Sequence, residues 1–385
     1  MRIKIKIERG KFQIIFKNFT KFLNLRTKSF YGVFMNFKKI TSALLVAGFA
    51  TAAFAADAEI GLKANVQTQA TKMLADDSSN FSSLWIRANI GAQYKSESID
   101  GLVMLRIFAP QFGNKIKDGD GKTTSYDKIL ADLYWVNYKW SLNDNNKLNL
   151  KIGHWKTDWS QSTHFGTYID KDLTARGLWM RDYAHNALEL GWKNGVSQFS
   201  AMLATRDNKM NSGYIRIEED LKFEFPLEAK LAYRVNAIDP LQHTVAVTHR
   251  VAAYLSYKII PEFRIYGEYA HIGTADENVP KNTPNYLAPE SKYMEPGKHY
   301  NPFYFGAEFA PKDGIMSILM SNLYLEWERI GDRQEVHKSS KKMDDWAWTL
   351  AWAKKIGQSK LQFSLYSGNE MSDLGLAFRL TSTFK

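Results

Sequence analysis

Apolar and polar residues alternate along most of the chain after residue 56. Within residues 84–94 the even positions are apolar, whereas the odd positions after Trp85 are Arg87, Asn89, Gly91 and Gln93. Successive side chains of a β-strand point to opposite faces, so this alternation indicates a strand with one dry face and one wet face. The same rhythm returns at residues 60–67, 148–153, 227–236, 346–352 and 376–380. The pattern predicts an all-β protein.

About sixteen such segments are predicted between residue 56 and the C-terminus. Every second connection is short, as at 96–98, 141–146 and 194–195, and most of the others are longer, as at 110–125, 158–183, 273–300 and 331–344. An even strand number, with short turns at one end and long loops at the other, is typical of a transmembrane antiparallel β-barrel of the bacterial outer membrane. The predicted strands are residues 58–68, 83–95, 99–109, 126–140, 147–157, 184–193, 196–205, 213–225, 227–238, 244–258, 263–272, 301–310, 317–330, 345–354, 360–367 and 374–384.

A soluble β-sandwich is the alternative fold. It would place its apolar faces in one core, and at this length we would expect a domain boundary, yet no linker or change of composition interrupts residues 56–385. Trp and Tyr also gather near predicted strand ends, for example Trp135, Tyr138 and Trp140 before one short turn. Amphipathic rings prefer the depth of the lipid headgroups, so this placement favours a single barrel domain over residues 56–385.

The N-terminal region predicts export. Residues 35–55 combine a short basic segment, an apolar run rich in small residues, and the sequence Ala53-Phe54-Ala55. This is the pattern of a secretory signal peptide cleaved near Ala55; a membrane anchor, the alternative, needs a longer apolar run. Residues 1–34 precede this signal and are interpreted as an upstream extension that results from a translation start assigned too early, with a real cytoplasmic tail as the alternative.

Charge and cysteine content narrow the function classes. The chain has 51 Lys and Arg against 40 Asp and Glu, but residues 1–55 hold 11 of the basic residues and one acid, which leaves 40 against 39 in the remainder. The basic excess therefore does not predict a nucleic-acid partner. The absence of cysteine excludes disulfides, thiol nucleophiles and cysteine-type zinc sites.

If the apolar register faces lipid, the opposite register lines the lumen. A charged Arg or Lys facing lipid at mid-membrane costs roughly 2–4 kcal/mol, so the gathering of charges in one register is informative. His249 and Glu219 depart from the pattern, and either a β-bulge near residue 218 or a misplaced strand end would account for the second. The predicted pore-lining residues are Lys63, Arg87, Arg106, Asp132, Lys151, Arg234, Arg250 and Arg264, and the same register holds Glu189, Arg216, Glu218, Glu268, Glu326, Glu328 and Arg379.

Taken together, these features resemble the bacterial porins over residues 56–385. The last predicted strand carries Leu376, Phe378 and Leu380 and ends with Phe384, followed by Lys385. In that family a terminal Phe is read by the barrel-assembly machinery, and the barrels often form homotrimers. The resemblance implies both for this chain, together with contact with outer-membrane lipid.

The resemblance also implies a role for the third long loop, residues 157–183. In porins this loop folds into the lumen and forms a constriction, opposite basic residues of the wall; an ordinary surface loop is the alternative. The residues implied in the constriction are Asp158, Asp170, Lys171, Asp172, Arg176, Arg181 and Asp182.

The leading functional prediction is passive diffusion of small hydrophilic solutes or ions. A channel specific for a sugar or an organic acid, and a non-conducting barrel that serves as an adhesin or structural protein, stay open as alternatives. The eight His residues are scattered and form no HExxH pair, and residues 117–122 lack the later ligands of a calcium loop. We therefore predict no metal, no cofactor and no enzymatic activity, although catalytic sites assembled across strands escape such a search.

Overall fold

The computed structural model describes residues 59–74, 83–108, 116–117, 123–124, 130–156, 184–205, 212–238, 245–274, 299–329, 344–367 and 370–384. The predicted extension 1–34 and signal peptide 35–55 lie outside these residues and stay predictions. Within the described part, no helix has the length and hydropathy needed to span a membrane.

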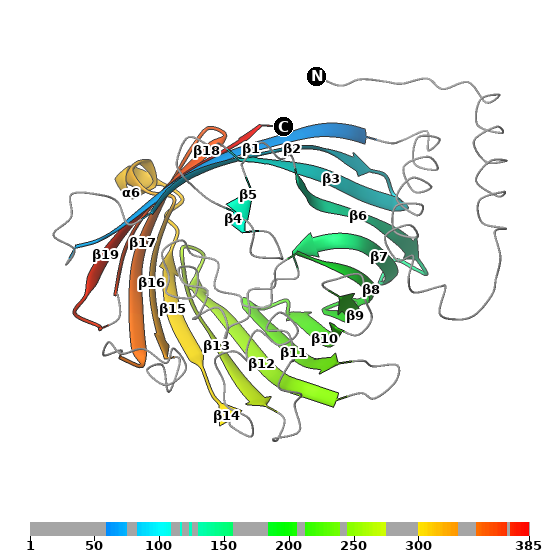
Figure 1. Ribbon diagram of the computed structural model, residues 1–385. Helices are drawn as coiled ribbons and strands as arrows, with labels where there is room; N and C mark the ends of the chain where they lie inside the picture. Colours follow the sequence, from blue (N-terminus) through cyan, green and yellow to red (C-terminus); the bar gives the residue numbers. More distant parts are fainter. Residues whose placement is uncertain are drawn as a thin grey trace.

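Seventeen antiparallel strands form one closed sheet (Figure 1). The short β14 and the following β15 both pair with β13, so the sheet has sixteen positions around its circumference. Ten residue pairs join β1 to β19 and close the ring, which confirms the predicted all-β barrel of about 16 strands. The strands are β1 (Glu59–Met73), β2 (Ser83–Lys95), β3 (Ile99–Phe108), β6 (Leu130–Ser141), β7 (Asn146–Lys156), β8 (Ala184–Asn194), β9 (Ser197–Thr205), β10 (Ser212–Lys222), β11 (Leu227–Ile238), β12 (Val245–Ile260), β13 (Phe263–Thr274), β14 (His299–Tyr300), β15 (Phe303–Phe309), β16 (Asn322–Arg329), β17 (Trp346–Ile356), β18 (Ser359–Ser367) and β19 (Leu374–Phe384).

Short turns and long connections alternate as predicted. The first strand, β1, begins and the last strand, β19, ends at the short-turn end of the barrel. Two of the tightest turns depend on glycine, because Gly195 and Gly357 adopt φ values of 54° and 56°. Residues with a side chain rarely adopt this left-handed conformation, which matches the twist of a two-residue hairpin. Tight turns of this kind fix the register of the strands they join.

Side-chain exposure alternates along the strands as the sequence predicts. On β12, Arg250 is 1% exposed and Leu255 is 58% exposed. In a closed sheet one register faces the enclosed interior and the other the surroundings, so the charged register is inward and the apolar register outward. Trp346, Trp348 and Trp352 follow the outward register of β17. The prediction is wrong for Trp135, whose ring lies on the inner face beside Lys151 and not at the lipid-facing surface.

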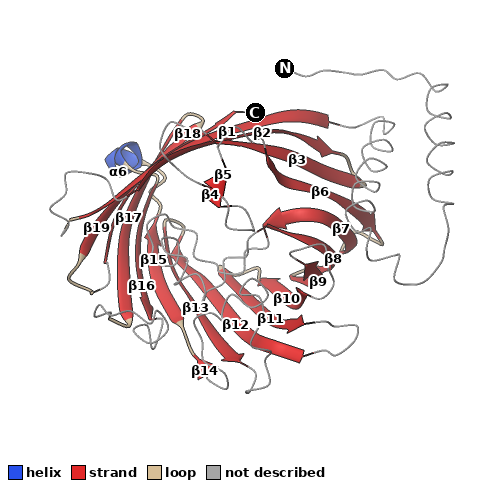
Figure 2. Cartoon of the chain, in the orientation of Figure 1, coloured by secondary structure: helices blue, strands red, loops and turns tan. Residues whose placement is uncertain are grey.

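Three details of the prediction are wrong. The segment predicted as strand 317–330 overlaps the last three residues of the helix α6 (Gly314–Leu319), the only helix in the described part (Figure 2), and β16 begins at Asn322. β1 extends to Met73, beyond the predicted end at residue 68. The predicted bulge near 218 is absent, because β10 pairs with both neighbours without a register shift. Glu219 instead lies in the outward register and accepts a hydrogen bond from Ser197 Oγ at 3.0 Å.

A separate ribbon, β4 (Ile116–Lys117) with β5 (Thr123–Thr124), lies in the connection between β3 and β6. Residues 118–122, the centre of the polar segment considered above as a cation loop, lie outside the described residues.

Candidate channel lining

The structure places the predicted pore-lining residues in the inward register. Arg234 and Arg250 are 3% and 1% exposed, and the others are partly buried. Asp132 reaches the interior through a register shift between β3 and β6 at Met104/Leu105, where it forms an ion pair with Arg106. Without that shift its position in the alternation would point outward. The role of these residues in lining a pore stays a prediction.

Three arginines lie side by side on adjacent strands. Arg216 of β10 pairs in register with Arg234 of β11, which pairs with Arg250 of β12. All three side chains are buried, at 6%, 3% and 1% exposure. Directly opposed like charges destabilise a sheet, so this arginine row is an unusual arrangement that concentrates positive charge on one part of the inner wall.

Carboxylates and tyrosines line the neighbouring part of the wall, on β13 to β16. Tyr266 Oη donates to Glu326 Oε1 at 2.7 Å, and Tyr304 Oη donates to Glu268 Oε2 at 3.1 Å. Glu268 also approaches the arginine row, with 3.7 Å between its Oε1 and Arg250 Nη2. The two regions, arginine row and carboxylate–tyrosine wall, therefore meet between β12 and β13.

Further ionic contacts hold the side chains of this wall in place. Arg264 forms an ion pair with Glu308, and its guanidinium carbon lies 4.9 Å from the centre of the Tyr266 ring. On β10 and β11, Lys230 Nζ contacts Glu218 at 2.6 Å and Asp220 at 3.1 Å. A charge that is held by partners presents a fixed field to a passing solute, so the wall is electrostatically preorganised.

A basic side chain flanked by two indoles lies on the inner wall at β6 and β7. Lys151 Nζ is 4.7 Å from the Trp135 ring centre and 4.4 Å from that of Trp155. Trp155 packs against Met202 and Ala204, which immobilises it. Contacts between an ammonium group and aromatic faces are favourable by about 0.5–2 kcal/mol, so Lys151 is positioned by its neighbours.

Polar side chains line the inner wall near the short turns of β17 to β19. They surround a cavity of about 680 Å³ whose lining includes Lys360, Gln362, Thr381 and Thr383. The inward register at this end is thus polar and accessible.

Two groups of residues escaped the sequence analysis. The first group consists of inward tyrosines such as Tyr266 and Tyr304. The same alternation that located the charged residues could have identified them, but it was applied only to charges. The second group, His249, His271 and His299, comes from three neighbouring strands and lies far apart in the sequence. The implied constriction residues from Asp158 to Asp182 lie outside the described residues.

The architecture and the charged inner wall define the class: the chain has the fold of the porin-like outer-membrane β-barrels. It is similar to OmpF of Salmonella typhi, solved in complex with daunomycin, at 12% identity, a TM-score of 0.57, and coverage of 85% of this chain and 98% of that one. It is also similar to a loop-deletion variant of OmpT, an outer-membrane protein of Vibrio cholerae, at 9% identity, a TM-score of 0.50, and coverage of 85% and 99%. No protein-family model and no curated protein matches the chain.

The inward register can be tested by cysteine labelling, because the chain has no cysteine of its own. We expect Arg87→Cys to react with a small, membrane-impermeant thiol reagent in reconstituted vesicles, since Arg87 lies inside and bonds to Gln67. Ile86→Cys and Ala88→Cys, on the opposite face, are expected to resist the reagent. Mass spectrometry of the labelled chain measures the outcome, and the reverse pattern would mean an inverted register.

Proposed function

We propose that this protein is an outer-membrane porin, a passive diffusion channel for small hydrophilic solutes or ions. The observation that carries the proposal is the contrast between the two registers of one closed sheet. The inward face carries buried charge of both signs, as in Arg234 and Glu326, while the outward face carries exposed apolar side chains such as Leu255. A barrel of sixteen strand positions encloses an aqueous channel in this architecture, and its wall charges set ion preference.

Planar-bilayer recording tests this function. The purified protein is expected to insert and produce stable, stepwise increases in conductance that scale with the salt concentration. Heat-denatured protein in the same detergent is the control, and it should give no steps. A folded protein that inserts without conducting would contradict the proposal and favour a non-conducting barrel that serves as an adhesin or structural protein.

A solute-specific channel for a sugar or an organic acid is the second candidate. The observation in its favour is the proximity of inward tyrosines to fixed arginines, as at Tyr266 and Arg264. Aromatic faces suit sugar rings and guanidinium groups suit carboxylates, so such a wall can select. In the same recordings, a conductance that saturates or is blocked as one solute is titrated would distinguish this channel from a passive pore.

The remaining parts of the proposal follow from the resemblance to porins. We place the chain in the outer membrane, in contact with lipid along its outward face. The barrel-assembly machinery reads the last strand, which ends at Phe384, and the folded barrels form a homotrimer. We propose that residues 157–183 supply the constriction, with acids such as Asp170 and Asp172 facing basic residues of the wall. Acids on the loop and bases on the wall would create an electric field across the lumen. The inner wall itself also carries acids, at Glu268 and Glu326, so this field does not depend on the loop alone.

A further inference from the structure

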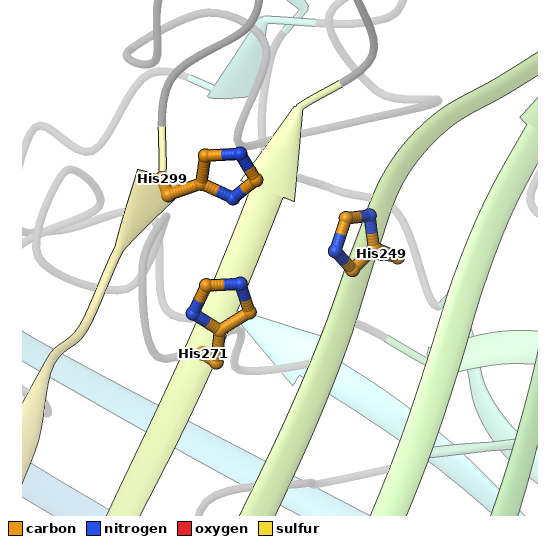
Figure 3. A group of neighbouring side chains, drawn as sticks. All are labelled: His249, His271 and His299. Atoms are coloured by element: carbon orange, nitrogen blue, oxygen red, sulfur yellow. The ribbon is translucent and has the colours of Figure 1, made fainter.

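Three histidines converge on the outward face of the barrel at the long-loop end (Figure 3). His249 lies on β12, His271 on β13 and His299 on β14, and one ring nitrogen of each lies within 4.8 Å of those of the other two. The His271 and His299 rings stack with their centres 5.2 Å apart, and the His249 ring centre lies 6.0 Å and 6.3 Å from theirs. We call this group the histidine cluster.

Strand pairing explains the convergence. His249 and His299 both pair in register with Gly273 of β13, one from each side, and His271 lies two residues away on the same face. A Cβ atom at Gly273 would lie 2.3 Å from His249 Cε1 and 2.6 Å from its Nε2. The absence of a side chain at Gly273 therefore lets the His249 ring lie across β13, toward the other two.

A hydrogen bond orients one of the three rings. His271 Nδ1 lies 2.9 Å from Asn301 Oδ1, and Tyr269 Oη donates to the same oxygen at 2.7 Å. When His271 Nδ1 carries the proton and donates it to Asn301 Oδ1, Nε2 carries none, so its lone pair can bind a metal ion. A metal-binding histidine commonly donates its second ring nitrogen in this way, which fixes the tautomer.

The chemistry of the cluster fits a metal ion. Imidazole nitrogens suit Zn²⁺, Cu²⁺ and Ni²⁺, and three of them with an open fourth position form a known type of zinc site. In a tetrahedral zinc site with Zn–N bonds of about 2.0–2.1 Å, ligand nitrogens lie roughly 3.3 Å apart. The three nitrogens now lie within 4.8 Å of one another, so binding one ion requires the rings to rotate and bring them closer.

We propose that His249, His271 and His299 bind one divalent transition-metal ion, with Zn²⁺ as the test ion. The site lies on the outer surface, where His271 pairs in register with the exposed Val251. Metal binding there does not depend on conduction through the lumen. β14 pairs with β13 through only two residue pairs, so a shared ion joins β12, β13 and β14 at the point where residues 275–298 return to the sheet.

Zinc binding by the folded full chain tests the proposal. The protein, made without a polyhistidine tag, is stripped with chelator in detergent and titrated with Zn²⁺ by calorimetry. We expect one ion per chain, and at least about a tenfold loss of affinity in each of His249→Ala, His271→Ala and His299→Ala, because each removes one of three ligands. Gly273→Ala keeps all three histidines in the sequence but should weaken binding, because the added Cβ atom would displace the His249 ring.

His154→Ala is the matched control. His154 is also an outward histidine near the long-loop end of its strand, and its Nδ1 also contacts an asparagine oxygen, that of Asn186, at 3.1 Å. Its removal should leave zinc binding unchanged. Circular dichroism verifies that each variant is folded, and Co²⁺ absorption provides a second readout of the ligand set. Failure of the wild type to bind near one ion per chain, or an equal loss in His154→Ala and His299→Ala, would overturn the proposal.

Discussion

Replacing Leu255 with arginine is expected to lower the free energy of unfolding in lipid vesicles by about 2–4 kcal/mol. Leu255 is an outward residue of β12, 58% exposed, and its neighbours in register are Ala229 and Gly267. It lies five residues from the short-turn end at Ile260, which is about 17 Å along the strand and roughly 13 Å in depth at the usual tilt. This places it near the middle of an apolar band about 25 Å tall, where a guanidinium loses its hydration.

Ile259→Arg is the matched control for Leu255→Arg. Ile259 lies on the same strand and is 52% exposed, but it is next to the short turn, where water and headgroups solvate the charge. Its expected effect is about 0–1 kcal/mol, and reversible urea unfolding in vesicles measures both. A soluble barrel would tolerate arginine equally at both exposed positions, so equal and small effects would contradict a lipid-facing outward register.

The sequence was sufficient to predict the fold because alternation is a local signal with a strong energetic cause. The predicted strand 83–95 coincides with β2, since shifting one residue would turn its whole apolar face inward. The segment before β16 was misassigned because a six-residue helix leaves little periodicity to read. The helix α6 begins at Gly314, whose φ of 67° redirects the chain after β15, and β16 begins only at Asn322.

The candidate sites were predictable only in part, because they depend on which residues become neighbours across strands. Alternation placed Arg234 and Arg250 inside, but their alignment with Arg216 in one row depends on register, which turns and bulges set. Asp132 reaches Arg106 through an irregularity that no periodicity reveals. The histidine cluster joins residues that are 22, 28 and 50 positions apart in the sequence, with Gly273 as the only local sign.

Ion selectivity is expected to respond in opposite directions to charge removal on the two parts of the inner wall. Arg234→Gln removes the central charge of the arginine row and should shift permeability toward cations, whereas Glu326→Gln should shift it toward anions while keeping an acceptor for Tyr266. At an effective dielectric constant of 20, a charge about 7 Å from a passing ion is worth up to ~2 kcal/mol, so after screening we expect roughly three- to tenfold changes in the permeability ratio.

Lys312→Gln is the control. It removes an exposed charge in the turn after β15 and should leave the permeability ratio unchanged. Reversal potentials in a salt gradient measure all three, and a Lys312→Gln shift as large as that of Arg234→Gln would mean that the arginine row does not face the permeation path.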